Sequence, residues 1–197
     1  MAPLFKKIIL GFLILLTLNV SAQGPLRHVK TDIFELWYSE QYLEPTQVHY
    51  AVLCNSKTHF SRAGLNFYSN DSIRTTTDSY YKNNDYDKGH MAPAADFNCN
   101  ENWLKETFSY LNCTLQNQYL NRGVWKELED YERELAMTST VYVEIEIEFK
   151  GATKVKDALV PSGFFKTLYR NGKPYQKYYF PNVKPTKDWQ SYLIQTF

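Results

Sequence analysis

Residues 123–150, GVWKELEDYERELAMTSTVYVEIEIEFK, hold the clearest helical pattern and the clearest strand pattern of the chain. In the first half, apolar side chains recur with the spacing that forms one stripe along a helix, at Val124, Leu128, Tyr131 and Leu135. We therefore predict a helix over Gly123–Met137, with Asn121 as its N-cap. In the second half, apolar and polar residues alternate over Val141–Lys150, which predicts a strand with one buried face.

The polar face of that predicted strand carries Glu144, Glu146 and Glu148. Three carboxylates on one face have two interpretations, a cation site or a solvated sheet face. A hard-cation site needs ligands that converge from several segments of the chain, whereas these three share one segment. We therefore favour the solvated face.

Shorter patterns complete the fold prediction. Alternation and β-branched or aromatic content predict further strands, and an apolar face predicts one more helix. These elements are a short strand through Phe34, Leu36 and Tyr38, a strand over Val48–Cys54, a hairpin of Phe164–Tyr169 with Tyr175–Phe180 around Asn171-Gly172, and a helix over Glu101–Tyr110. The polar residues 69–87 are expected to form a loop. Because strands and helices mix without βαβ regularity, the predicted class is α+β with a mixed or antiparallel sheet.

The chain begins with a pattern of export. Lys6 and Lys7 precede the apolar run Ile8–Leu18, and Val20-Ser21-Ala22 supplies small residues suited to a peptidase. The alternative, a membrane anchor, is disfavoured because a spanning helix needs about 20 apolar residues. We therefore expect a signal peptide over 1–22, one domain over 23–197, and a secreted or periplasmic mature protein without stable membrane association.

Composition is that of a globular protein, with 44% hydrophobic and 16% aromatic residues. Without Lys6 and Lys7, the 22 basic residues fall to 20 against 21 acidic ones, which is a formal charge of −1. Nucleic-acid binders are usually basic overall. Any attraction to phosphate in this chain must therefore come from a local patch.

Three cysteines, Cys54, Cys99 and Cys113, follow the predicted signal peptide. Export allows disulfides, and an odd number of cysteines leaves one thiol over. Cys99 with Cys113 is one pairing, and three buried thiols are the alternative.

Two polar clusters supply residues suited to catalysis. In the first, Asp87-Lys88-Gly89-His90, a lone histidine is more often structural than catalytic and the glycine could serve a turn. The second contains Asn112, Gln116, Asn121, Trp125, Glu129 and Arg133. Taken singly, Asn121 caps a helix, Trp125 packs, and Glu129 forms an exposed ion pair with Arg133, four residues away on a face turned from the apolar stripe. Together, the clusters offer a base, a neutral oxygen ligand, a carboxylate and a guanidinium.

Both clusters resemble one family. DKGHMAPAADF (87–97) is similar to the DRGH motif of the DNA/RNA non-specific endonucleases, which are ββα-metal or His-Me finger nucleases. LNCTLQNQYLNRGVWKELEDYERELA (111–136) resembles the second motif of that family, in which Asn-x-Gly-x-Trp opens a helix that carries Glu and Arg. The similarity spans roughly Tyr50 to Tyr169, and VPSGFFK (160–166) resembles a late strand of the family. The resemblance implies a ββα-metal finger that carries the active site.

The resemblance also implies roles for individual residues. His90 matches the general base, and Asn121 matches the direct protein ligand of one divalent ion, Mg²⁺ or another such as Mn²⁺. Glu129 matches the carboxylate that holds the water shell of the metal, and Arg133 matches an arginine near the scissile phosphate. The remaining matches are Asn112, counted with the catalytic set as an asparagine that supports the site, Arg62 and Lys88 as nucleic-acid contacts, and Asp87 and Gly89 as supporting motif positions.

This chain departs from the family pattern in three places. Lys88 replaces the usual arginine and loses the bidentate geometry that suits phosphate. Leu111 and Leu115 stand where the family often has Ser and Pro. The usual Gly-Pro turn is missing after the predicted Val141 strand.

The implied activity is hydrolysis of phosphodiester bonds in DNA and RNA with little sequence specificity. A neutral His90 would activate water, and because the reference pKa of histidine is near 6.5, activity is expected to fall under acid conditions. Three alternatives remain: a catalytically impaired nucleic-acid-binding member, a phosphodiesterase that prefers single strands or RNA, and a structural exported domain. The sequence leaves open a monomer or a homodimer, and whether an inhibitor protein exists.

Overall fold

A computed structural model describes residues 24–54, 59–151 and 153–197, so the predicted signal peptide over 1–22 lies outside the described residues. Its main feature is a seven-stranded sheet of antiparallel neighbours in the order β1-β2-β3-β6-β9-β10-β11. The predicted α+β class with an antiparallel sheet is confirmed. The strands are β1 Arg27–Lys30, β2 Phe34–Ser39, β3 Glu44–Ala51, β6 Val141–Glu148, β9 Gly163–Arg170, β10 Lys173–Pro181 and β11 Leu193–Thr196.

The hairpin of β9 and β10 forms where the sequence predicts it. Asn171 and Gly172 connect the strands with φ of 51° and 76°, and positive φ at both positions is what a two-residue hairpin turn requires. Asn and Gly tolerate that conformation better than other residues. Local chemistry therefore favours this turn, and Asn171 also accepts a hydrogen bond from Thr140 N at 3.1 Å.

The glutamates of β6 lie on the face of the sheet turned away from the core. Glu144 accepts a hydrogen bond from Tyr169 at 2.7 Å, Glu146 pairs with Lys177 at 3.2 Å, and Glu148 accepts from Tyr179 at 2.9 Å. Each carboxylate therefore has a different protein partner. These glutamates therefore lie on a partly exposed polar face of the sheet.

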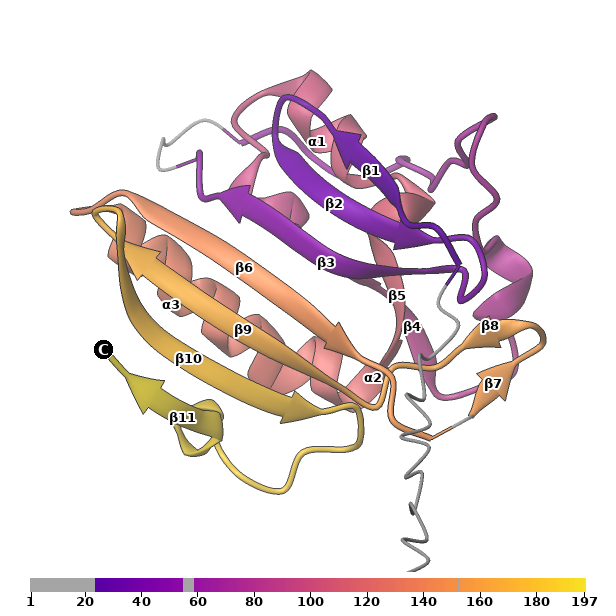
Figure 1. Ribbon diagram of the computed structural model, residues 1–197. Helices are drawn as coiled ribbons and strands as arrows, with labels where there is room; N and C mark the ends of the chain where they lie inside the picture. Colours follow the sequence, from indigo (N-terminus) through magenta and orange to yellow (C-terminus); the bar gives the residue numbers. More distant parts are fainter. Residues whose placement is uncertain (1–23, 55–58, 152) are drawn as a thin grey trace, which may run out of the picture.

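The helices include α1 (Glu101–Thr107), the short α2 (Gln118–Leu120), a π-helical turn over Asn121–Trp125, and α3 (Lys126–Ala136). Helix α3 lies against one face of β6, β9 and β10 (Figure 1). Its predicted stripe packs against the core, and the fully buried Trp125 ring meets Phe164 and Phe180 at centroid distances of 5.3 and 5.6 Å. Within the described residues, no helix is long and apolar enough to cross a membrane.

The predicted N-cap at Asn121 is wrong. The α-helical geometry of α3 begins at Lys126, and Asn121 already has right-handed helical φ/ψ. Asn117 acts as the cap instead, because its side-chain oxygen accepts hydrogen bonds from the backbone N–H groups of Tyr119 and Leu120 at 3.1 and 3.4 Å. The side chain of Asn121 is thereby left for other contacts.

A second, two-stranded sheet leads into these helices. Strand β4 (Tyr86–His90) pairs with β5 (Cys113–Asn117) in antiparallel register, from Tyr86 opposite Asn117 to His90 opposite Cys113. Because α2, the π-helical turn and α3 follow β5 directly, the unit is two strands and a helix (Figure 1). The predicted loop over 69–87 therefore ends in a strand. The remaining elements are the small hairpin β7 (Lys154–Val155) and β8 (Ala158–Leu159), and 3₁₀ turns at Asp78–Tyr80, Ala94–Asp96, Tyr110–Asn112 and Trp189–Tyr192.

Gly89 lies inside β4, which corrects its interpretation as a turn residue. A Cβ atom at this position would lie 2.5 Å from Cβ and 2.3 Å from Oε1 of the buried Gln116 on β5. Glycine is therefore required by the close approach of a neighbouring side chain.

Gly89→Ala is expected to lower the free energy of unfolding by about 1–3 kcal/mol, the usual cost of overpacking. Chemical denaturation of both proteins measures this change. Gln116→Ala is not expected to restore stability to Gly89→Ala, because the clashing Cβ of residue 116 remains. An unchanged denaturation midpoint in Gly89→Ala would contradict this packing argument.

Candidate active site

Five of the predicted site residues line one cleft of about 250 Å³. His90 comes from the end of β4, Asn121 from the π-helical turn, and Glu129 and Arg133 from α3. Arg62 reaches the same cleft from the segment after β3. The structure therefore brings together residues from three separate parts of the chain, as the two motifs predict.

His90 is held between aromatic rings. Its ring centroid lies 4.9 Å from that of Phe67 and 5.1 Å from that of Phe108. The Nε2 atom is buried and has no hydrogen-bond partner in the described part of the protein. No protein acceptor at Nε2 therefore stabilises the protonated ring.

Burial is the main cause of an unusual pKa at this histidine. Burial, together with the nearby cations Arg62 and Lys88, lowers the pKa of His90 to about 4. The fall in activity that is expected under acid conditions is therefore placed at a lower pH than the reference value near 6.5 implies, because burial disfavours the charged imidazole. The sign is unchanged: the ring is neutral above its pKa and charged below it.

Asn121 is oriented by the first residue of the Asp87-Lys88-Gly89-His90 motif. The Asn121 amide nitrogen donates to Asp87 Oδ2 at 2.9 Å, so the amide oxygen is its remaining polar atom. Asp87 also accepts from Arg122 Nε at 2.8 Å and from Arg122 Nη2 at 2.6 Å. One carboxylate on β4 thus fixes the direction of the Asn121 side chain.

The donor set of the cleft suits a weakly held, hydrated Mg²⁺. The Asn121 amide oxygen and the Glu129 carboxylate are hard oxygen donors, and Mg²⁺ keeps several waters while using one or two protein ligands. Within the described residues, no group of three His, Cys, Asp or Glu side chains is arranged to hold a metal. These donors therefore fit an ion with few protein ligands better than a closed structural site.

The surroundings of Glu129 disfavour the charged form of its carboxylate. Burial and the neighbouring Glu132 raise the pKa of Glu129 to about 7, although Lys166 and Arg133 act in the opposite direction. A cation in the cleft would favour the charged form of this carboxylate.

Arg133 is held in place by two carboxylates. It donates to the fully buried Asp96 at 2.7 Å and also to Asp130. The expected exposed ion pair of Glu129 with Arg133 is not formed, because Asp96 and Asp130 take the guanidinium. Arg133 thus contributes a fixed charge to the wall of the cleft.

The cleft wall is predominantly cationic. Its charged side chains are Arg62, Arg122, Lys126, Glu129 and Arg133. Arg122 and Lys126 were not predicted from the sequence, although basic residues close to Asn121 were a usable signal. Arg122, Lys126 and Arg133 also pair with carboxylates that do not line the cleft, so their charge is partly offset.

Two other predicted site residues, Lys88 and Asn112, do not line this cleft. Lys88 lines an adjoining cavity with Arg62, His90 and Asn121, and its ammonium pairs with Asp78 at 2.6 Å. Asn112 is fully buried, and its side chain accepts from Ala92 N at 2.8 Å while donating to the carbonyls of Ala92 and Thr107. Grouping Asn112 with the catalytic side chains is therefore corrected: it supports the backbone that follows His90 and does not line the cleft.

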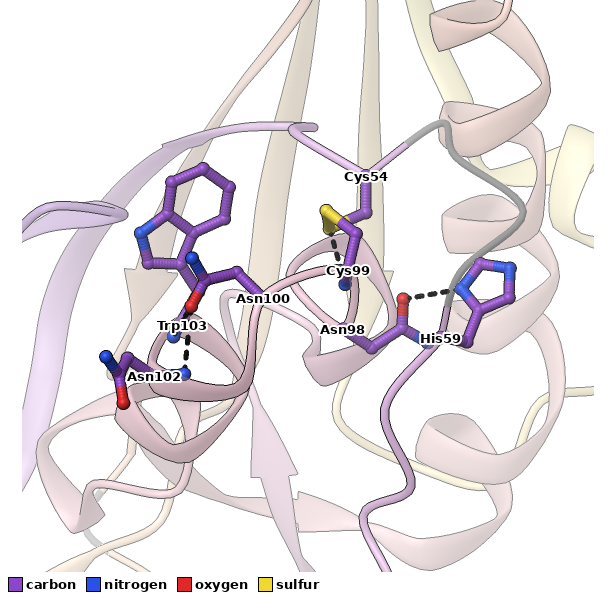
Figure 2. Close-up of a disulfide and its surroundings, with 7 residues drawn as sticks. All are labelled: Cys54, His59, Asn98, Cys99, Asn100, Asn102 and Trp103. Atoms are coloured by element: carbon purple, nitrogen blue, oxygen red, sulfur yellow. Dashed lines mark hydrogen bonds between the residues drawn. A yellow bond between two sulfur atoms is a disulfide. The ribbon is translucent and has the colours of Figure 1, made fainter.

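A disulfide joins Cys54 to Cys99, with the two Cα atoms 5.4 Å apart (Figure 2). The proposed pairing of Cys99 with Cys113 is wrong, because Cys113 is a buried free thiol on β5. Beside the disulfide, Phe60 N donates to Asn98 O at 2.7 Å, and the His59 ring lies 2.8 Å from Asn98 Oδ1. These contacts anchor the segment that carries Arg62.

Replacing both disulfide cysteines, as Cys54→Ser/Cys99→Ser, is expected to lower the free energy of unfolding by about 2–4 kcal/mol, since the bridge closes a loop of 45 residues. Thermal and denaturant unfolding with and without reductant measure this change. Reductant should shift the wild type and leave the double variant unchanged. A wild type whose stability is insensitive to reductant, while its thiols are shown to be reduced, would contradict the expectation.

The two-strand-and-helix unit, with a histidine on the first strand and an asparagine and glutamate at the helix, is the ββα-metal nuclease fold. The family model of the DNA/RNA non-specific endonucleases matches residues 20–196. The chain belongs to this family.

Individual relatives match about half of the chain at moderate sequence identity. The chain is 30% identical over 125 residues to mitochondrial endonuclease G of Bos taurus, covering 55% of this chain and 42% of that protein. It is 32% identical over 104 residues to a nuclease of Serratia marcescens, covering 47% and 38%. The chain thus spans less than half the length of these relatives. A solved EndoG/EndoGI complex superposes with a TM-score of 0.75 at 22% identity, covering 88% of this chain and 82% of that one.

Proposed function

We propose that the protein is an exported, Mg²⁺-dependent endonuclease that hydrolyses DNA and RNA with little sequence preference. The observation that carries the proposal is the convergence of His90, Asn121, Glu129 and Arg133 on one cleft with a cationic wall. Membership of the family supports the same activity. The cationic side chains of this lining suit contacts to phosphate and sugar, which carry no direct sequence information.

The cationic wall has the first task. A phosphodiester is anionic and repels a nucleophile, so hydrolysis needs positive charge where negative charge accumulates. In this proposal, Arg62, Arg122 and Lys126, which line the cleft, hold the substrate backbone, and Arg133 lies in the same wall. Because these contacts are electrostatic, binding is expected to weaken as salt rises.

His90 has the second task, which is to take a proton from the attacking water. Its neutral imidazole is an acceptor at any pH above its pKa. Asn121 and Glu129 would hold the divalent ion, which, when bound, supplies Lewis-acid stabilisation of the negative charge on the leaving oxygen. Asp87 keeps the Asn121 side chain in the orientation that this requires.

The pH dependence follows from the depressed pKa of His90. With that pKa near 4, the base is neutral above this value, and its contribution to catalysis is lost only as the pH falls through about 4. NMR titration of the metal-free protein is expected to give a midpoint near 4 for the His90 ring. Arg62→Ala should raise this midpoint, since a nearby cation is removed. A midpoint near 6.5 in the wild type would contradict the burial argument.

A substrate panel tests the proposed activity. The mature protein is incubated with supercoiled plasmid, single-stranded DNA and single-stranded RNA, each with Mg²⁺ and with excess EDTA. Cleavage of all three in Mg²⁺ alone is expected. Cleavage of only the single strands or of RNA would favour the narrower phosphodiesterase, and binding without cleavage would favour the catalytically impaired member.

Export and partners belong to the same proposal. The amino-terminal pattern and the Cys54–Cys99 bridge both suit an oxidising compartment, such as the periplasm or the medium. DNA and RNA are the proposed substrates. An inhibitor protein is a compatible partner, because the structurally similar EndoG is solved in a complex that concerns its inhibition.

A further inference from the structure

A buried lysine stands behind the cleft, where the sheet meets α3. Lys166 lies on β9 between the core residues Phe164 and Leu168, and its side chain is 0% exposed. An apolar side chain would fill this position at lower cost, because a buried charge must be stripped of water. Packing alone therefore does not explain a lysine here.

The contacts of Lys166 converge on the start and the middle of the helical segment. Its Nζ lies 2.7 Å from Glu132 Oε1 and 4.4 Å from the centre of the Trp125 ring. The other oxygen of Glu132 accepts a hydrogen bond from Tyr50 OH at 2.8 Å. One carboxylate of α3 is thus held from β9 and β3 at once, and the same ammonium packs on the residue that ends the π-helical turn.

Glu132 is buried and lies between two cleft residues in the sequence of α3. Glu129 precedes it by almost one helical turn and Arg133 follows it directly, and both line the cleft. A shift or rotation of α3 would therefore move both side chains together. The charges are also linked, because Lys166 attracts Glu129 while Glu132 repels it.

We propose that Lys166 is a positioning residue of the active site, whose ammonium holds Glu132 and Trp125 so that α3 presents Glu129 and Arg133 to the cleft. The inference rests on the proposed nuclease function. It adds to that function a side chain that touches neither substrate nor metal and acts through α3.

The test removes the charge without leaving an unpaired carboxylate. Lys166→Met alone would leave the buried Glu132 carboxylate without its cationic partner and destabilise the protein. The main variant is therefore Lys166→Met/Glu132→Gln. Lys166→Gln is the second variant, because it keeps a hydrogen-bond donor for Glu132 and loses the positive charge. Lys166→Arg restores the charge. Circular dichroism and Tm establish which variants are folded before kinetics are measured.

A folded charge-free variant is expected to lose at least tenfold in kcat for plasmid cleavage at saturating Mg²⁺, while KM changes less than threefold. Lys166→Arg should keep at least a third of the wild-type kcat. Isothermal titration with Mn²⁺ alone should show at least threefold weaker binding in the charge-free variant. Lys177→Met is the matched control: it removes a lysine that pairs with Glu146 on the other face of the sheet, and it should change kcat less than twofold.

A folded charge-free variant with the kcat of the wild type would overturn the role of Lys166. The role would also be overturned if Lys166→Arg lost as much kcat as the charge-free variant. If the wild type cleaves no nucleic acid while binding Mn²⁺, the proposed function fails instead. In that case the Mn²⁺ titration alone decides whether Lys166 positions the cleft residues.

Discussion

His90→Ala is expected to lower kcat for plasmid cleavage by about 10²–10⁴-fold, the usual contribution of a positioned general base. The imidazole lines the cleft with Asn121 and Glu129, and burial keeps it in the neutral, proton-accepting form. KM for the substrate should change little, because the cationic wall remains in place. Single-turnover and steady-state assays at pH 7 measure both constants.

His28→Ala is the matched control for this loss. His28 lies on β1, where it pairs with Glu35 at 2.6 Å and stacks on Trp37. Its removal should change kcat less than twofold, and circular dichroism should show that both variants are folded. Near-normal cleavage by His90→Ala would remove His90 from the mechanism.

Asn121→Ala is expected to lower kcat by about 10²–10³-fold at fixed Mg²⁺ and to weaken metal binding, since it removes the proposed direct protein ligand and with it charge stabilisation at the phosphate. Excess EDTA should abolish wild-type activity in the same assay, and added Mg²⁺ should restore it. Asn121→Asp is not expected to rescue, because a carboxylate there would lose the donor to Asp87 and face its charge at close range.

Asn102→Ala is the control for this series, because Asn102 is exposed near the start of α1, away from the residues that line the cleft. It should retain full activity and Mg²⁺ dependence. Full turnover of the wild type in excess EDTA, or an active Asn121→Ala variant, would contradict the assignment of the metal ligand.

Local patterns predicted the parts of the fold that local chemistry decides. The β9–β10 hairpin depends on two residues that accept positive φ, and the stripe on α3 depends on helical spacing. The start of the helix differs from the prediction because Asn117 caps the turn before it and the backbone is interrupted at Gly123. Asp87 holds both Asn121 and Arg122, while Gly123 has a non-helical backbone with φ of −106° and ψ of −117°.

The candidate site likewise contains residues that the sequence predicted and residues that only the structure reveals. Motif resemblance placed His90, Asn121, Glu129 and Arg133 together, and the cleft contains all four. Residues that act through three-dimensional neighbours carried no local signal: Lys166 looks like an ordinary strand lysine until its partners Glu132 and Trp125 are known. The pairing of Cys54 with Cys99 likewise depends on how the chain returns to β3, not on cysteine spacing.

The central claim is that the His90 imidazole and the Asn121 carboxamide share one hydrated cation. It is tested by an anomalous difference map from crystals of the wild-type protein grown with Mn²⁺ and without nucleic acid. One dominant peak is expected inside the cleft, at coordination distance from the Asn121 amide oxygen and separated from Glu129 by water. A dominant peak elsewhere on the protein, or an empty cleft in crystals that bind Mn²⁺ at another site, would contradict it.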